Sequence, residues 1–177
     1  MIISKEDRKE MLLKVGVPRV FLDTLDNIQN ESELRFMIKQ PDDFYFYINS
    51  IYQNYECIKD YNIVPVFEGD NGDEFYVYLF NDKEQKFAHF ELENDELYSD
   101  HGTSFDLMLA NLLIDLYEFA EDLSISELVK KGEMIGAKFS KQLFEQLVVA
   151  EENNLRSSFE LDKKWRKNNL KEIVKSC

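Results

Sequence analysis

The chain has few of the residues that mark linkers, crosslinks and metal sites. Its 177 residues include six Gly, three Pro, two Cys and two His. So little Gly and Pro argues against a flexible linker or a low-complexity tract. The two cysteines, Cys57 and Cys177, show no metal-ligand spacing, and Cys57 is expected to be a small core residue with a free thiol.

Sequence motifs of catalysis are also missing. There is no Gly-rich phosphate loop, nucleophile elbow, Cys pair or His-Glu-x-x-His pattern. His89 and His101 match no strong ligand motif, so a metal site is the weaker interpretation. Asp70–Glu74 lacks the full ligand pattern of a calcium loop and favours a tight turn. We therefore predict a protein that is not an enzyme and needs neither a cofactor nor a metal.

Long apolar runs and excess positive charge are absent as well. No run of about 18 uncharged apolar residues occurs, and the N-terminus lacks the pattern of a signal peptide, which predicts a cytoplasmic protein without membrane contact. The 21 Lys and Arg against 35 Asp and Glu give a net charge of −14. Direct nucleic-acid binding is disfavoured, because it relies on Lys and Arg. The same charge would speed encounter with a basic protein.

What is present is enough apolar sequence for one core and a readable pattern of helices. Hydrophobic residues make up 44% of the chain and aromatic residues 14%. A first helix is expected between the N-cap Ser4 and Gly16, and a second is opened by Pro18. A short helix is expected over Glu31–Lys39, and an aromatic one over Phe44–Tyr55, whose apolar stripe is typical of helix-to-sheet packing.

Four strands are expected after this helical region. They cover Ile63–Phe67, Phe75–Phe80, Phe87–Leu92 and Leu97–Tyr98. Pro65 lacks an N–H, so the first strand belongs at an edge or a strand start. The second strand is apolar on both faces, which predicts an interior position. The third strand alternates, which predicts a half-exposed strand with His89 and Glu91 on its outer face.

Helices are expected again from residue 105 onward. The segment Phe105–Phe119 is apolar around most of its circumference, and Ser124 caps the next helix. Further helices are expected over Ser140–Asn154 and Asp162–Lys175, the last being rich in Lys and Arg. Its basic side chains fit a solvated helix face, or pairing with the chain's own sheet or a dimer mate. The fold class is thus α+β: a single small, mostly antiparallel sheet packed by helices, with a C-terminal helical extension.

Charge is concentrated in the strand region. Glu68 to Asp100 holds eleven Asp or Glu against two Lys, a balance of −9. A solvated acidic rim is the simplest reading, because unpaired carboxylates are seldom buried. The same rim would also suit a basic protein partner. The candidate partner-binding residues are Glu68, Asp70, Asp73, Glu74, Glu91, Glu93, Asp95 and Glu96, with Tyr76, Tyr78 and Tyr98 as aromatic anchors.

The order of these features carries a family resemblance. A strand Ile63-Val64-Pro65-Val66-Phe67, a Gly/Asp turn, two strands, an acidic turn and Thr103-Ser104-Phe105 opening an apolar helix follow one another. This order resembles the SUKH superfamily, which includes fungal cell-wall (glucan) synthesis regulators and many bacterial immunity proteins. The likeness covers roughly residues 5–122. It implies a SUKH-like α+β domain over 1–122 and a helical extension over 123–177.

The resemblance implies a binding domain that in bacteria neutralises a toxin by occluding it. Many such toxins are nucleases with basic surfaces, which agrees with the acidic charge found here. A housekeeping regulator or scaffold, similar to the glucan synthesis regulators, is the alternative. A third hypothesis is a small-molecule-binding protein that uses the aromatic helix Phe44–Tyr55 and the two histidines.

Overall fold

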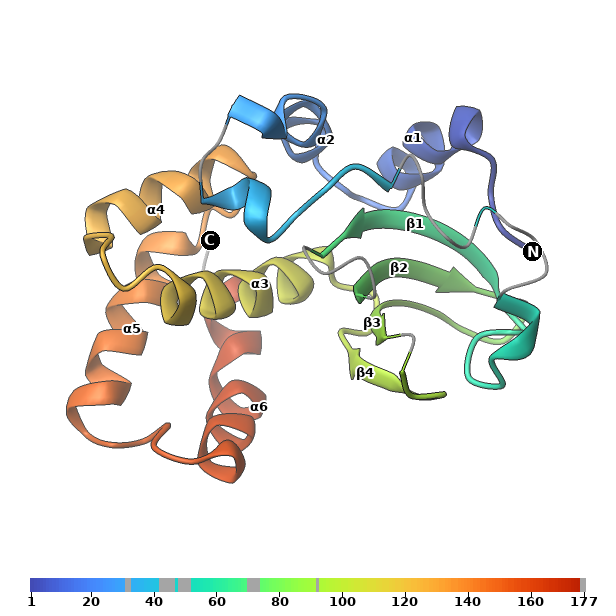
Figure 1. Ribbon diagram of the computed structural model, residues 1–177. Coiled ribbons are helices and arrows are strands. Elements are labelled where there is room, and N and C mark those ends of the chain that lie inside the picture. Colours follow the sequence, from blue (N-terminus) through green and yellow to red (C-terminus); the bar gives the residue numbers. More distant parts are fainter. Residues whose placement is uncertain (31–32, 42–46, 48–51, 70–73, 92, 176–177) are drawn as a thin grey trace. The chain divides into compact units, whose positions relative to one another are not determined.

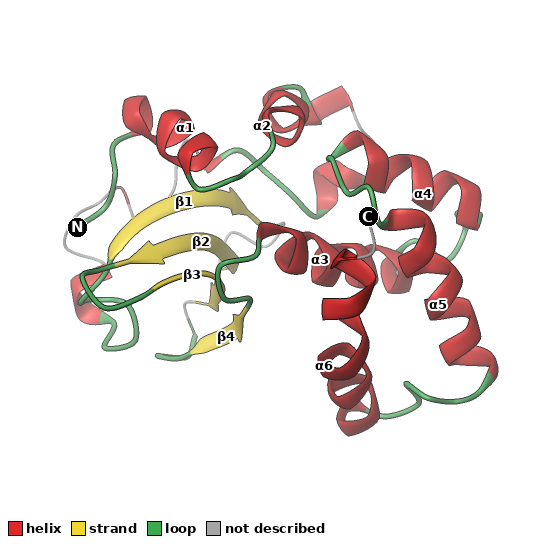
Figure 2. Cartoon of the chain, turned by 180° about the vertical axis from the view of Figure 1, so that it is seen from behind, coloured by secondary structure: helices red, strands yellow, loops and turns green. Residues whose placement is uncertain are grey.

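The computed structural model describes residues 1–30, 33–41, 47, 52–69, 74–91 and 93–175. The chain divides into two compact units, Met1–Phe105 and Asp106–Cys177. The first carries a four-stranded antiparallel sheet and the second is helical (Figures 1 and 2), which confirms the predicted α+β class. This boundary follows the first residue of the long apolar helix. The division at residue 122, which rests on the family resemblance, stays a prediction.

The strands lie side by side in the order of the sequence. They are β1 (Asn62–Glu68), β2 (Glu74–Phe80), β3 (Gln85–Glu91) and β4 (Leu97–Asp100). β1 is an edge strand, as Pro65 predicted, and β2 is interior, as its apolar composition predicted. All neighbouring pairs are antiparallel. The β1–β2 and β3–β4 turns therefore lie at one end of the sheet, and the β2–β3 turn at the other.

In the described part of the chain, two α-helices precede the sheet. α1 (Lys5–Lys14) begins after Ser4, whose side chain accepts a hydrogen bond from a backbone N–H in the first turn, as predicted. Gly16 ends this region with a φ of +93°, which glycine adopts without strain. α2 (Arg19–Asp26) follows Pro18. Figures 1 and 2 both show α1 running beside β1.

The segment between α2 and β1 is less helical than the sequence predicts. Within the expected Glu31–Lys39 helix, the described residues form only a short 3₁₀ helix, η2 (Leu34–Phe36), which follows η1 (Ile28–Asn30). Lys39 pairs with Glu68 in an isolated β-bridge, an extended conformation that no helix could supply. Most of the expected aromatic helix lies outside the described residues. Its described end forms η5 (Tyr52–Asn54), another 3₁₀ helix.

Apolar side chains cover both faces of the sheet. On one face, the buried residues form a cluster with Tyr52 and Ile58 from the preceding segment. The strand members of this cluster are Ile63, Phe75, Val77, Leu79, Ala88 and Phe90. On the other face, Phe21 of α2 packs on Phe67 and Phe105, with ring centroids 5.8 and 5.0 Å apart. The sheet is thus a buried layer with α2 against one face.

The second unit consists of helices. They are α3 (Phe105–Phe119), which enters this unit from Asp106 onward, α4 (Ile125–Met134), α5 (Ser140–Glu152) and α6 (Phe159–Lys175). The predicted cap at Ser124 forms a full capping box with Glu127. The core of this unit includes Leu109, Leu113, Leu116, Leu128, Phe144, Leu147 and Trp165. All three predicted helices after residue 123 are therefore present.

Candidate functional site

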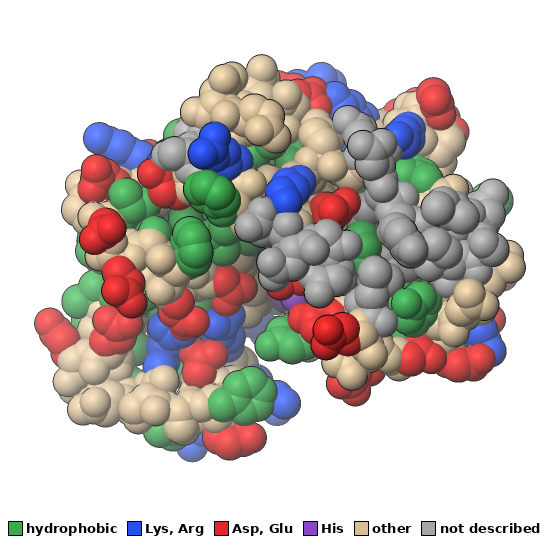
Figure 3. Space-filling view, viewed as in Figure 1, with side chains coloured by type: hydrophobic (Ala, Val, Ile, Leu, Met, Phe, Trp, Pro, Cys, Tyr) green, Lys and Arg blue, Asp and Glu red, His purple; other side chains and the backbone are tan. Residues whose placement is uncertain are grey.

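The sheet gathers most of the predicted carboxylates at one end. Glu68 lies opposite Phe75, and Glu74 lies opposite Glu91, so the three glutamates end β1, begin β2 and end β3 at the same place. The β3–β4 turn follows there, with Glu93 and Glu96 exposed. We call these five residues, Glu68, Glu74, Glu91, Glu93 and Glu96, the acidic end. Figure 3 shows Asp and Glu side chains along the lower rim of the sheet unit.

The sheet unit also carries most of the net charge. Residues 1–105 contain 10 Lys and Arg against 22 Asp and Glu, a net charge of −12. Residues 106–177 contain 11 against 13, a net charge of −2. The negative field of the chain therefore comes almost wholly from the unit that bears the acidic end.

One predicted carboxylate of the β3–β4 turn also has a role within the chain. Asp95 accepts hydrogen bonds from the backbone N–H groups of Glu56 and Cys57, at 2.9 and 3.1 Å. These bonds lower the pKa of Asp95 below its usual value. Its exposed carboxylate therefore holds the chain before β1 in place. Its role as a contact residue stays a prediction. Asp70 and Asp73 lie outside the described residues.

The tyrosines separate into buried and exposed ones. Tyr76 and Tyr78 are buried in the interior strand β2, so their prediction as anchors for a partner was wrong. The reason is that both faces of β2 are covered, which leaves neither side chain at the surface. Tyr98 lies on the edge strand β4 and is 65% exposed. It is the one predicted aromatic anchor that the structure leaves accessible.

An aromatic ladder joins Tyr98 to the interior of the sheet. Phe67 stacks on Tyr76 with ring centroids 4.1 Å apart, and Tyr76 stacks on His89 at 4.3 Å. His89 in turn contacts Tyr98 at 5.0 Å. One ring comes from each strand, so the ladder crosses the whole sheet and holds Tyr98 at its open end. Sequence alternation could not reveal it, because the pairing register decides which rings meet.

His89 is buried, which corrects the prediction that it lies on an exposed face of β3. Its Nε2 has no hydrogen-bond partner and lies 3.7 Å from Oε1 of Glu91. Burial, with the neighbouring His101, lowers the pKa of His89 to about 4. The imidazole is thus neutral near pH 7, and its approach to Glu91 is not a salt bridge under those conditions.

The described residues include two histidines and one cysteine, Cys57. Among them, no group of three or more His, Cys, Asp or Glu is arranged to hold a metal ion. His101 is buried, with Nε2 2.9 Å from Oγ of Ser99. Burial, with Asp95, raises the pKa of the half-buried Cys57 to about 12, so its thiol is not poised to form a thiolate.

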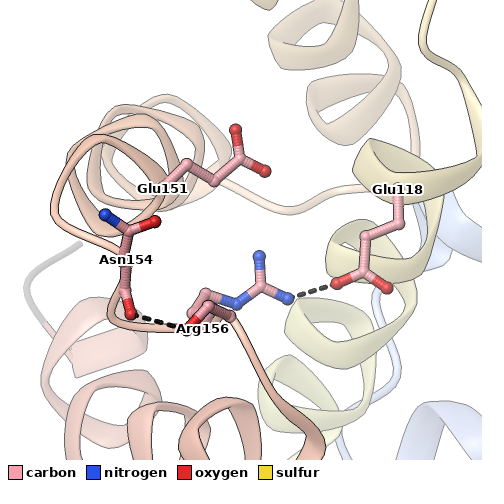
Figure 4. A pocket seen from close by; sticks show the side chains of 5 residues that line it. Glu118, Glu151, Asn154 and Arg156 are labelled. Atoms are coloured by element: carbon pink, nitrogen blue, oxygen red, sulfur yellow. Dashed lines mark hydrogen bonds and ion pairs between the residues drawn. The ribbon is translucent and has the colours of Figure 1, made fainter.

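A pocket of about 280 Å³ lies in the helical unit. Its lining residues are Glu118, Glu151, Asn154, Arg156 and Ser157. Figure 4 shows Arg156 reaching from the α5–α6 connection to Glu118 of α3. Arg156 also pairs with Asp162 at 2.5 Å, and its guanidinium lies 5.5 Å from the Trp165 ring. The cation in this pocket is therefore already engaged by the protein itself.

Arg166 continues the same ion-pair network along α6. It lies 3.2 Å from Asp115 and 2.6 Å from Asp162. The basic character predicted for the last helix is thus used in part to bind Asp115 and Glu118 of α3 within the helical unit. These contacts between helices point to a structural role for the two arginines.

Comparison with family models, with curated proteins and with solved structures gave no match. Within the described part of the chain, every helix is too short or too polar to cross a bilayer.

Proposed function

We propose that this chain is a non-catalytic protein-binding domain, and that it acts as an immunity protein that neutralises a basic, nuclease-type toxin. The observation that carries the proposal is the placement of the acidic end on a sheet unit with a net charge of −12. Nuclease clefts are basic because they bind phosphates, and an acidic protein surface can occupy such a cleft. The resemblance to the SUKH superfamily supports the same function.

The electrostatics favour Glu93 and Glu96 as the first contact residues. Both are exposed and lie in the turn between β3 and β4. Charged residues at such a rim act mainly on the rate of association and on its salt dependence. Glu68, Glu74 and Glu91 are only half exposed and flank this turn at the strand ends. We therefore expect Glu93 and Glu96 to speed the approach of the partner. The strand-end glutamates should add to the negative potential around this pair.

The test is co-expression of the chain with toxin-like genes that adjoin its own gene. We expect the chain to restore growth and to form a stoichiometric complex that weakens as salt rises. The double variant Glu93→Lys and Glu96→Lys should weaken this complex about tenfold. The matched control, Glu133→Lys with Glu152→Lys, makes the same charge change at exposed positions of the helical unit and should bind normally.

Two results would contradict the proposal. One is the absence of growth rescue together with the absence of a salt-sensitive complex. The other is equal loss of binding in the acidic-end variant and in the control variant, which would mean that net charge alone matters. Retention of many substoichiometric partners from a cell extract, with no single basic partner, would favour the scaffold function instead.

A further inference from the structure

The two edges of the sheet differ in how their backbone groups are used. Along β1, the outer edge is occupied: Ile63 exchanges hydrogen bonds with the N-terminal segment, and Glu68 exchanges two with Lys39. The guanidinium of Arg8 binds the carbonyl oxygens of Pro65 and Val66 between these points. The edge of β1 is therefore covered by its own chain.

The other edge is formed by β4 and is open in the part of the chain that the structure describes. β4 pairs with β3, and no described strand or bridge pairs with its outer side. His101 donates its backbone N–H to Phe87 of β3 at 2.9 Å. Because backbone groups alternate in direction along a strand, the N–H and C=O of the preceding residue, Asp100, point away from β3. These groups are the donors and acceptors that an added strand would use.

We propose that β4 is the docking edge for an extended, Lys- and Arg-bearing segment of the partner, which adds to the sheet as a fifth strand beside Tyr98. This inference rests on the proposed function, because it names how the basic partner binds. Strand addition is a recurring mode in which backbone hydrogen bonds supply affinity and side-chain contacts supply specificity.

Charge selects the occupant of this edge. Glu96 precedes β4 and Asp100 ends it, and both are exposed. A second copy of the chain would bring a sheet unit with the same charge of −12 and would be repelled. A basic strand is attracted by the same carboxylates. The short length and the charge of β4 thus protect it from self-association without excluding a cationic partner.

Tyr98 supplies a prepared contact for that strand. Its ring is 65% exposed, and it packs against His89 at the end of the aromatic ladder. Because the His89 contact already restricts the Tyr98 ring, the ring loses little conformational entropy on binding. An exposed tyrosine face also attracts Lys and Arg side chains through cation–π contacts. An extended basic segment therefore fits the open edge, the negative charge beside it and the Tyr98 ring.

The experiment uses the full chain and an eight-residue peptide in which Lys alternates with Val and Thr, with blocked ends. We expect salt-sensitive binding that slows hydrogen exchange of the Asp100 amide at least tenfold. Tyr98→Ala should raise the Kd at least fivefold. The matched control is Phe159→Ala, an exposed aromatic residue of the helical unit, and it should leave the Kd unchanged.

A second peptide separates strand addition from simple charge attraction. It has the same sequence but carries N-methyl groups on its four central residues, which removes backbone N–H donors from both of its edges. We expect it to lose at least tenfold in affinity. Equal binding of the two peptides, protection that maps away from β4, or no binding of the first peptide would overturn the inference.

The outcomes also separate this inference from the proposed function. If Tyr98→Ala still rescues growth from a toxin and the peptide does not bind, the immunity function stands and the edge is not its binding site. If the peptide binds at β4 but no toxin is neutralised, the edge stands and the immunity function does not.

Discussion

Arg8 of α1 donates from Nε to the backbone carbonyl oxygen of Pro65 in β1 at 2.7 Å, and its side chain is only 4% exposed. The register of β1 against β2 shifts at this place, between Pro65 and Phe67. A bulge leaves backbone groups without ladder partners, and a buried carbonyl without a hydrogen bond is costly. Arg8 satisfies two of them, since it also binds the carbonyl of Val66.

We expect Arg8→Met to lower the free energy of unfolding of the sheet unit by about 3 kcal/mol, because buried hydrogen bonds to a charged group are lost. Arg8→Lys should recover little of this, since an ammonium cannot reproduce the two-pronged guanidinium contact. Lys9→Met is the control, because Lys9 forms an exposed ion pair with Asp26 and should cost about 1 kcal/mol or less. Hydrogen exchange of β1 amides in denaturant measures each value. Equal costs for Arg8→Met and Lys9→Met would refute the assigned role.

His89 should make the sheet unit sensitive to acid. Its pKa is about 4 in the folded chain and 6.5 in an unfolded one, so the unfolded state binds a proton more readily between these values. The free energy of unfolding should therefore fall as the pH drops from 6.5 toward 4, by up to about 3 kcal/mol.

The variant His89→Phe keeps a ring to stack on Tyr76 and removes the titrating group and the unpaired Nε2. It should be at least as stable as the parent chain at pH 7 and lose this part of the acid dependence. Hydrogen exchange of β3 amides at pH 7 and pH 5 provides the comparison, after correction for intrinsic exchange rates. An unchanged pH dependence in His89→Phe would exclude His89 as its source.

Asp115 should act in the opposite direction in the helical unit. Its surroundings desolvate the carboxylate and raise its pKa from 3.8 to about 6, although Arg166 opposes this shift. The folded state then binds a proton more readily than the unfolded state between pH 6 and pH 4, so protonation of Asp115 adds stability as the pH falls. A carboxyl carbon NMR titration of Asp115 should show a midpoint near 6. This titration should be absent in Asp115→Asn and unchanged in the control Asp122→Asn. A midpoint near 3.8 in the parent chain would disprove the raised pKa of Asp115.

Gly132 should not tolerate a methyl group, although it lies inside α4. A Cβ at this position would lie 2.5 Å from the Cβ of Ser140, the first residue of α5. Alanine favours a helix over glycine by about 1 kcal/mol, but a clash with a fully buried neighbour costs about 1–3 kcal/mol. We expect Gly132→Ala to lower the thermal unfolding midpoint and a second change, Ser140→Gly, to restore much of the loss. The exposed control Glu133→Ala should not lower the midpoint, and a stabilised Gly132→Ala would contradict the close packing.

The strands and most helices could be predicted because their signals are local. The local signals are the apolar run Phe75–Phe80, the N-caps Ser4 and Ser124, and the apolar segment Phe105–Phe119. Each depends on residues a few positions apart. The predicted helix over Glu31–Lys39 failed because this segment pairs at Lys39 with β1, and distant pairing overrides weak local propensity. The His89 environment was missed for a related reason: its burial comes from neighbouring strands.

The sequence by itself determined the α+β class, the excess of negative charge and its concentration between Glu68 and Asp100, since these depend on composition and local order. Only the tertiary structure decided which residues are buried or exposed and which hydrogen bonds they form. It placed Arg8 on a bulge, tied Asp95 to the backbone, buried Tyr76 and left Tyr98 exposed on an open edge. The physical reason is that burial and hydrogen bonding are set by strand order and register, which bring together residues far apart in the chain.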